Sequence, residues 1–190
     1  MQAILDAIAG GTLDASVALV LSNRADAAGL RRAADAGVET LVLDHREASS
    51  REAYDAAVAD ALAARQVDVV CLAGFMRLLG PALLDRFPQR VLNIHPSLLP
   101  AFPGLAAQRQ AFEHGVKVAG ATVHLVTEAL DAGPIVAQAA VPVRDDDTVD
   151  TLSARILIEE HRLYPVAIAR LLDGGWRVEG RRFVVEDQVR

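Results

Sequence analysis

The stretch VDVVCLAGFMRLLGPALLDRFPQRVLNIH, Val67–His95, contains two apolar segments separated by a short helical turn that is predicted near Pro81. The first segment, Val67–Phe75, is almost continuously apolar, which is typical of a parallel strand buried on both faces. The second segment, Arg90–His95, is rich in strand-forming residues. Two strands joined by a helical connection indicate a parallel β-sheet.

The same alternation continues through the rest of the chain. Strands are predicted at 15–22, 39–44, 120–126 and 134–143, helices at 27–37, 49–66, 107–114 and 145–175, and a terminal hairpin at 176–186. We find no internal repeat and no linker. The sequence therefore predicts an α/β protein with a Rossmann-like, mostly parallel sheet flanked by helices and a small C-terminal hairpin, in one domain that covers residues 1–190.

Composition excludes several classes of function. Apolar residues make up 52% of the chain, charged residues 23% and aromatic residues 4%, with a net charge of −6. An acidic chain without a basic face is not expected to bind nucleic acid. Because no apolar run reaches the roughly 20 residues that span a bilayer, we expect no membrane partner. The single cysteine, Cys71, is consistent with a reducing cytoplasm, where we expect the protein to be located.

The candidate chemistry begins in the predicted strand that contains Asn93 and His95. Residues two apart on a strand share a face, so an amide and an imidazole can approach one point. Ligands of such sheets bind beyond the carboxyl ends of the strands, where these residues fall. An amide donor beside a protonated imidazole could stabilise an oxyanion. The alternative, that Asn93 caps a turn and His95 is a core residue, stays open.

A second candidate is Asp131, in a loop that precedes a predicted strand. Its carboxylate could orient His95 and favour the imidazolium, although an aspartate in a turn is more often structural. Ser97 lies only two residues from His95, outside any Gly-x-Ser-x-Gly motif, and so predicts no hydrolase triad. The histidines show no metal-ligand spacing, and Cys71 lies within an apolar run typical of a core. We therefore expect no metal.

Several segments resemble the glycinamide ribonucleotide formyltransferases, over nearly the whole chain and in order. They are SNRADAAGL (22–30), LAGFMRLL (72–79), VLNIHPSLLPAFPG (91–104), GATVHLVTEALDAGPIVAQAAVPV (120–143) and EEHRLYP (159–165). The Asn-x-His-Pro-Ser-x-Leu-Pro and Leu-Asp-x-Gly-Pro motifs are specific for the wider formyltransferase fold.

The resemblance implies transfer of a formyl group from 10-formyltetrahydrofolate, a co-substrate, to the amine of glycinamide ribonucleotide in purine biosynthesis, without a metal. It implies that Asn93, His95 and Asp131 are catalytic and that Glu160 binds the ribose hydroxyls. The implied folate-binding residues are Arg51, Leu72, Phe75, Met76, Arg77, Leu79, Val126, Glu128 and Gly133. A monomer or a homodimer is expected.

Two features depart from the family pattern. Ala106 and Ala107 replace residues that are usually polar, so a partner of Asp131 is expected to be missing. In addition, the family has a first strand and a phosphate-binding loop before the helix that matches QAILDAIAGG (2–11), and we expect both to be absent here. One hypothesis is that Met1 is an internal methionine of a gene product longer by about a dozen residues.

Three alternatives remain. A formyltetrahydrofolate hydrolase uses similar motifs but normally carries an N-terminal regulatory domain. A methionyl-tRNA formyltransferase would need a further C-terminal region and basic charge. The chain could also be a non-catalytic remnant that binds folate or nucleotide.

Overall fold

The computed structural model describes residues 1–186, so the last four residues of the expected domain lie outside the described residues. The helices are α1 (Gln2–Ala9), α2 (Ala28–Asp35), α3 (Arg51–Ala63), α4 (Pro81–Leu84), α5 (Ala107–Glu113) and α6 (Val149–Leu172). The strands are β1 (Val20–Ser22), β2 (Thr40–Val42), β3 (Val70–Leu72), β4 (Val91–His95), β5 (Val118–Leu125), β6 (Ile135–Pro142), β7 (Trp176–Glu179) and β8 (Arg182–Val185).

Local sequence explains where the long helices begin. The Ser50 side chain accepts a hydrogen bond from the Ala53 N–H at the start of α3. At the start of α6, Thr148 and Thr151 form a reciprocal capping box, and Asp150 lies in the first turn. Both arrangements satisfy backbone N–H groups that a helix leaves unpaired, and Asp150 complements the helix dipole.

Two sheets form the centre of the molecule. The larger has the order β3-β4-β5-β6-β8-β7, in which β3 and β4 are parallel and β5 is antiparallel to both of its neighbours. The smaller consists of the parallel strands β1 and β2. The predicted α/β class with a parallel sheet and flanking helices is confirmed, and the long strands β5 and β6 add antiparallel pairing to it.

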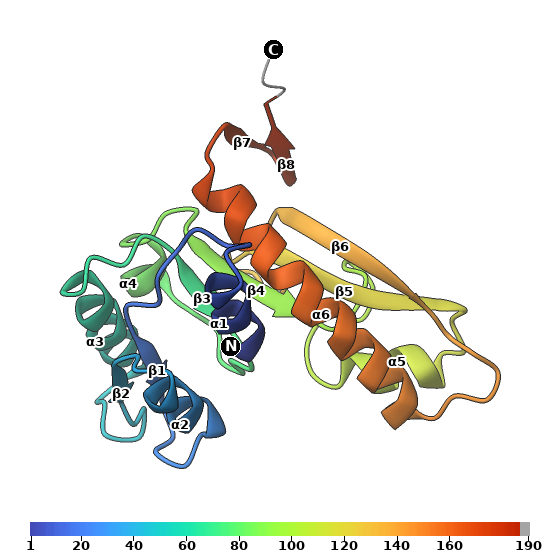
Figure 1. The fold of residues 1–190 in the computed structure, drawn as a ribbon, viewed down its shortest axis with the longest axis horizontal. Helices are drawn as coiled ribbons and strands as arrows, with labels where there is room; N and C mark the ends of the chain where they lie inside the picture. The colour runs from blue at the N-terminus through green and yellow to red at the C-terminus, as the bar shows by residue number, and fades with distance from the viewer. Residues whose placement is uncertain (187–190) are drawn as a thin grey trace.

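Helices cover both faces of the larger sheet (Figure 1). On one face, α1 and α6 pack over an aliphatic core that includes Leu92, Val123 and Ile168. On the other, α3 and α4 enclose a second core that includes Leu83 and Val91. Successive residues of β4 thus face opposite cores, as the alternation of a strand requires.

A cavity of about 1050 Å³ lies between the two sheets. Residues of β1, β3 and α1 line it, and within residues 1–186 no strand pairs with the facing edges of β1 and β3. The strands predicted at 15–22 and 67–75 are accordingly shorter in the structure, because the residues before β1 and before β3 border this cavity and have no neighbouring strand there.

The only cysteine, Cys71, also borders this cavity, yet burial raises the pKa of its thiol to about 12. At pH 8 only about one thiol in ten thousand is then the reactive thiolate. We expect iodoacetamide to leave Cys71 unmodified in the folded chain and to alkylate it fully once guanidinium chloride has unfolded the chain. Mass spectrometry measures the extent of modification. Fast modification of Cys71 in the folded chain would contradict the raised pKa of its thiol.

Among residues 1–186, no helix has both the length and the apolar character needed to cross a membrane.

Candidate active site

Asn93 and His95 lie near the carboxyl end of β4, on the face opposite Ile94. Ile94 packs against the core beneath α6, and the alternation of the strand therefore directs Asn93 and His95 away from α6. His95 is only 5% exposed and Asn93 is half-buried. The spacing seen in the sequence thus brings an amide and an imidazole to one face of the sheet.

Asp131 approaches the ring of His95. The distance from His95 Nδ1 to Asp131 Oδ2 is 3.5 Å, and both side chains are less than 10% exposed. His95 Nε2 lies 2.9 Å from the carbonyl oxygen of Phe102. Both ring nitrogens therefore face acceptors, an arrangement that only the imidazolium, with two N–H groups, can satisfy at once.

A second contact fixes the Asp131 carboxylate. The Gly104 N–H donates to Asp131 Oδ2 at 2.7 Å, and Asp131 itself adopts a left-handed backbone conformation (φ 47°), which aspartate tolerates better than most residues. Gly104 ends the proline-rich loop that follows β4. That loop and the loop before β6 therefore meet at Asp131.

The proline-rich loop is itself held by polar side chains. Ser97 Oγ donates to the Ala101 carbonyl at 2.6 Å, and Thr122 Oγ1 donates to the Ser97 carbonyl at 2.7 Å. Gln138 donates to the Leu99 carbonyl at 2.9 Å. Ser97 is 1% exposed, so its hydroxyl has a structural role consistent with the expectation that it is no nucleophile.

Sequence reasoning assigns no role to His124, which the structure places beside Asn93 and Asp131. His124 is the partner of Asn93 in the β4–β5 pairing and is 2% exposed. Its Nε2 lies 3.3 Å from Asn93 Nδ2 and 3.7 Å from Asp131 Oδ1. We refer to Asn93, His95, His124 and Asp131 as the polar cluster. The register of β4 and β5 is the only signal that could have revealed this member.

The residues expected to bind folate are only partly brought together. Leu72, Phe75, Leu79 and Val126 pack in one apolar cluster with the core under α3 and α4. Residues Leu72, Phe75, Met76, Arg77 and Leu79 also line the cavity between the sheets. Met76 is 75% exposed, and Glu128 is exposed on the loop before β6. Gly133 packs against the carbonyl of Leu125 instead.

Two arginines expected in this region lie near the first turn of α3. The guanidinium carbon of Arg77 lies 5.3 Å from the ring centroid of Tyr54, a cation–π contact. Within residues 1–186, the buried Nε of Arg77 has no hydrogen-bond partner. Arg51, the first residue of α3, is exposed, with its nearest acidic partner, Glu52, at 3.7 Å.

Glu160, on α6, is half-buried, and burial raises the pKa of its carboxyl to about 7 from an ordinary value of 4.5. Among residues 1–186, no cation forms an ion pair with it. A buried carboxyl of this kind is more stable when protonated or when a ligand supplies hydrogen-bond donors.

The burial of the Glu160 carboxyl leads to a prediction for the pH dependence of the stability of the folded chain. The unfolded chain ionises Glu160 near pH 4.5, whereas the folded chain resists ionisation up to about pH 7. The folded state therefore loses stability as the pH rises between these values. We expect Glu160→Gln to raise the Tm relative to the parent at pH 8 and to leave it nearly unchanged at pH 4.5, as measured by circular dichroism. A Tm difference that is independent of pH would contradict the prediction.

Ala106 and Ala107, where a polar partner of Asp131 was expected to be missing, precede and begin α5. Ala107 is completely buried, and Ala106 has a left-handed backbone (φ 55°). The Asp131 carboxylate instead accepts a hydrogen bond from the Gly104 N–H and lies near the ring of His124.

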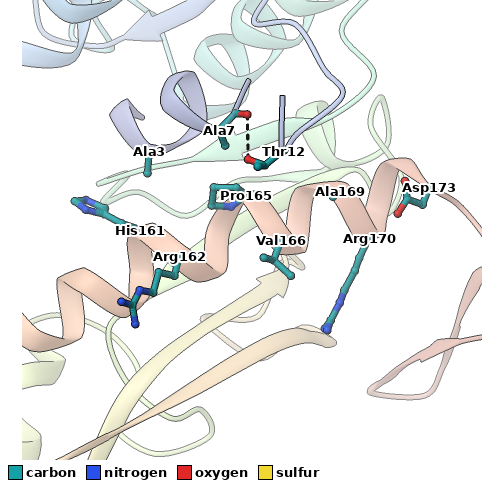
Figure 2. A pocket seen from close by; sticks show the side chains of 10 residues that line it. All are labelled: Ala3, Ala7, Thr12, His161, Arg162, Pro165, Val166, Ala169, Arg170 and Asp173. Carbon is teal, nitrogen blue, oxygen red and sulfur yellow. Dashed lines mark hydrogen bonds between the residues drawn. The ribbon is translucent and has the colours of Figure 1, made fainter. Parts of the chain in front are cut away.

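A smaller hollow of about 450 Å³ lies between α1 and α6 (Figure 2). Ala3 and Ala7 of α1 face Pro165 of α6 there, and His161 and Arg170 lie along its length. Neither the polar cluster nor Glu160 contributes a residue to its lining. Within residues 1–186, no group of three or more His, Cys, Asp or Glu side chains is arranged to hold a metal ion.

Residues 1–168 match the family model described as Formyl transferase. Because this match covers most of the chain, the chain belongs to the formyl transferase family. The chain is thus a formyltransferase by class.

Individual members of the family are similar to this chain over most of its length. The chain is 47% identical over 174 residues to phosphoribosylglycinamide formyltransferase of Escherichia coli K12, covering 92% of this chain and 82% of that protein. It is 47% identical to a trifunctional purine biosynthetic protein adenosine-3 of Drosophila melanogaster, of which it spans only 13% while 92% of this chain is covered. The crystal structure of glycinamide ribonucleotide transformylase 1 from Symbiobacterium toebii superposes with a TM-score of 0.95 at 59% identity, covering 98% of this chain and 88% of that one.

Proposed function

We propose that this chain transfers the formyl group of 10-formyltetrahydrofolate to the amine of glycinamide ribonucleotide. Relatives that match most of the chain carry the corresponding names, phosphoribosylglycinamide formyltransferase and glycinamide ribonucleotide transformylase. The observation that carries the proposal is the approach of Asp131 to His95, 3.5 Å apart, on the face of β4 that also bears Asn93.

In the proposed reaction, the substrate amine attacks the formyl carbon and forms a C–N bond. The carbonyl oxygen becomes an oxyanion, which the Asn93 amide N–H and the positive charge of His95 stabilise. Collapse of this intermediate breaks the bond between the formyl carbon and the folate nitrogen. The proton lost by the amine passes to that nitrogen, through water hydrogen-bonded to Asp131, so that the folate leaves neutral at this position.

The contact between His95 Nε2 and the Phe102 carbonyl bears on how His95 would stabilise the oxyanion. The oxyanion would either share the Nε2 N–H of His95 with the Phe102 carbonyl, or be stabilised chiefly by the positive charge of the imidazolium ring. Hydrogen bonds in catalytic sites often rearrange when substrate binds, so the 2.9 Å contact is compatible with either arrangement.

The binding roles proposed for the other residues are those that the family resemblance implies. We propose that the apolar cluster of Leu72, Phe75, Leu79 and Val126 contributes to the folate pocket together with Met76, Glu128 and Gly133. Arg51 and Arg77 would attract the anionic end of the folate. Glu160 would accept hydrogen bonds from the ribose hydroxyls, which would offset the cost of ionising its buried carboxyl.

Two measurements on the purified chain test the proposal. A transferase releases little formate from 10-formyltetrahydrofolate until glycinamide ribonucleotide is added, whereas a hydrolase releases it without an acceptor. Separate calorimetric titrations of nucleotide and folate address the remaining alternative. Folate binding without measurable turnover would identify a non-catalytic remnant and contradict the proposal.

A further inference from the structure

His124 is a buried histidine for which the proposed reaction has no role. It lies in β5, directly opposite Asn93 of β4, and its side chain is 3% exposed. The pairing of β5 with β6 is irregular between Val123 and His124, so the strand is distorted where this side chain meets the polar cluster. The titratable groups that face its ring are Asp131 and His95.

The hydrogen bonds of the ring define its tautomer. Nδ1 lies 2.9 Å from the carbonyl oxygen of Leu125, which can only accept, so Nδ1 carries the hydrogen. Burial lowers the pKa of His124, outweighing the opposing effects of the Leu125 carbonyl and Asp131, and so favours the neutral ring. In the neutral ring, Nε2 then holds a lone pair.

This lone pair determines the orientation of the Asn93 amide. Asn93 Nδ2 lies 3.3 Å from His124 Nε2 and can donate to it. Turning the amide by half a rotation would bring its oxygen against the same lone pair, which is unfavourable. The Asn93 amide is thus held with its nitrogen toward His124. The second N–H of that nitrogen has no partner among residues 1–186 and remains available to a ligand.

Protonation of His124 would change this arrangement. The imidazolium would offer an N–H at Nε2, which Asp131 Oδ1, 3.7 Å away, would attract more strongly than the amide of Asn93. Asn93 would then lose its acceptor and Asp131 would gain a second cationic neighbour.

We propose that His124 is a positioning residue whose neutral Nε2 holds the Asn93 amide with an N–H directed to the reacting formyl oxygen. The proposal rests on the catalytic role proposed for Asn93. Loss of the Nε2 acceptor leaves the amide free to rotate, so stabilisation of the transition state falls while substrate binding is largely preserved.

Two variants of His124 separate positioning from packing. Glutamine can place its side-chain oxygen near the site of Nε2, whereas asparagine is one methylene shorter and reaches only the site of Nδ1. We expect His124→Asn to lower kcat by about 10- to 100-fold with KM values changed less than about threefold. We expect His124→Gln to retain at least about ten times the kcat of His124→Asn. Equal kcat values in the two variants, with both folded by circular dichroism, would overturn the proposal.

A double-mutant cycle with Asn93→Ala provides the decisive comparison. If His124 acts through Asn93, adding His124→Asn to Asn93→Ala lowers kcat by less than about twofold. Multiplicative losses would overturn the proposal. If Asn93→Ala alone leaves kcat unchanged, the proposed function of the polar cluster fails; if it lowers kcat and His124→Asn does not, only the role of His124 fails.

Discussion

Replacing His95 with alanine is expected to lower kcat for formyl transfer at least about a hundredfold, and Asp131→Ala is expected to do the same. In the proposed mechanism, His95→Ala removes the positive charge that stabilises the developing oxyanion. Asp131→Ala removes the carboxylate 3.5 Å from the ring, which in the proposed mechanism stabilises that charge and holds the water that relays the proton. Initial rates measured with both substrates at saturation test both expectations.

A surface variant controls for the loss of an acidic residue. Asp85 is exposed at the end of α4, outside the polar cluster, and Asp85→Ala should therefore leave kcat unchanged. Asp131→Asn serves as the closest replacement, since it keeps the size of the side chain and loses the charge. Near-normal rates in both His95→Ala and Asp131→Ala would show that the proposed mechanism is wrong.

Gly133→Ala is expected to reduce stability by about 2–3 kcal/mol and to lower activity as well. A Cβ atom on Gly133 would lie 1.8 Å from the Leu125 carbonyl oxygen, so the loop before β6 would have to move away from β5. That loop carries Asp131, and the bond from the Leu125 N–H to the Pro134 carbonyl, 2.9 Å long, would be strained. Denaturant unfolding and the transfer assay measure the two effects.

Gly29→Ala is the matched control for this substitution. Gly29 lies in α2 and needs no left-handed backbone, and a Cβ atom added to it would meet no other atom within 4 Å. Its replacement should change stability by less than about 1 kcal/mol. A Gly133→Ala variant as stable as Gly29→Ala would contradict the close approach of Gly133 and Leu125.

Local patterns predicted much of the fold and one part of the site. The apolar run around β3 and the two-residue spacing of Asn93 and His95 each act over a few positions, and the structure contains the corresponding strand and shared face. The approach of Asp131 to His95 was also anticipated, first as one possible role for a loop aspartate and then from family resemblance.

Contacts that depend on tertiary structure could not be read from the sequence. The pairing of Asn93 with His124 depends on the register of β4 and β5, which no local pattern specifies. The Phe102 carbonyl reaches His95 only because of the path of the proline-rich loop. The raised pKa of Glu160 results from its burial in the folded chain. Its charged neighbours in the sequence, Glu159 and His161, give no indication of that burial.

The most direct test follows the formyl carbon itself. We would mix the purified chain with 10-formyltetrahydrofolate labelled with ¹³C in the formyl group and with glycinamide ribonucleotide, and record ¹³C NMR spectra over time. The account predicts that the label moves from the folate to an amide on the nucleotide without accumulating as formate, and that Asp131→Asn slows this movement at least about a hundredfold. Label that appears as formate at the same rate with and without the nucleotide, or that never leaves the folate, would contradict it.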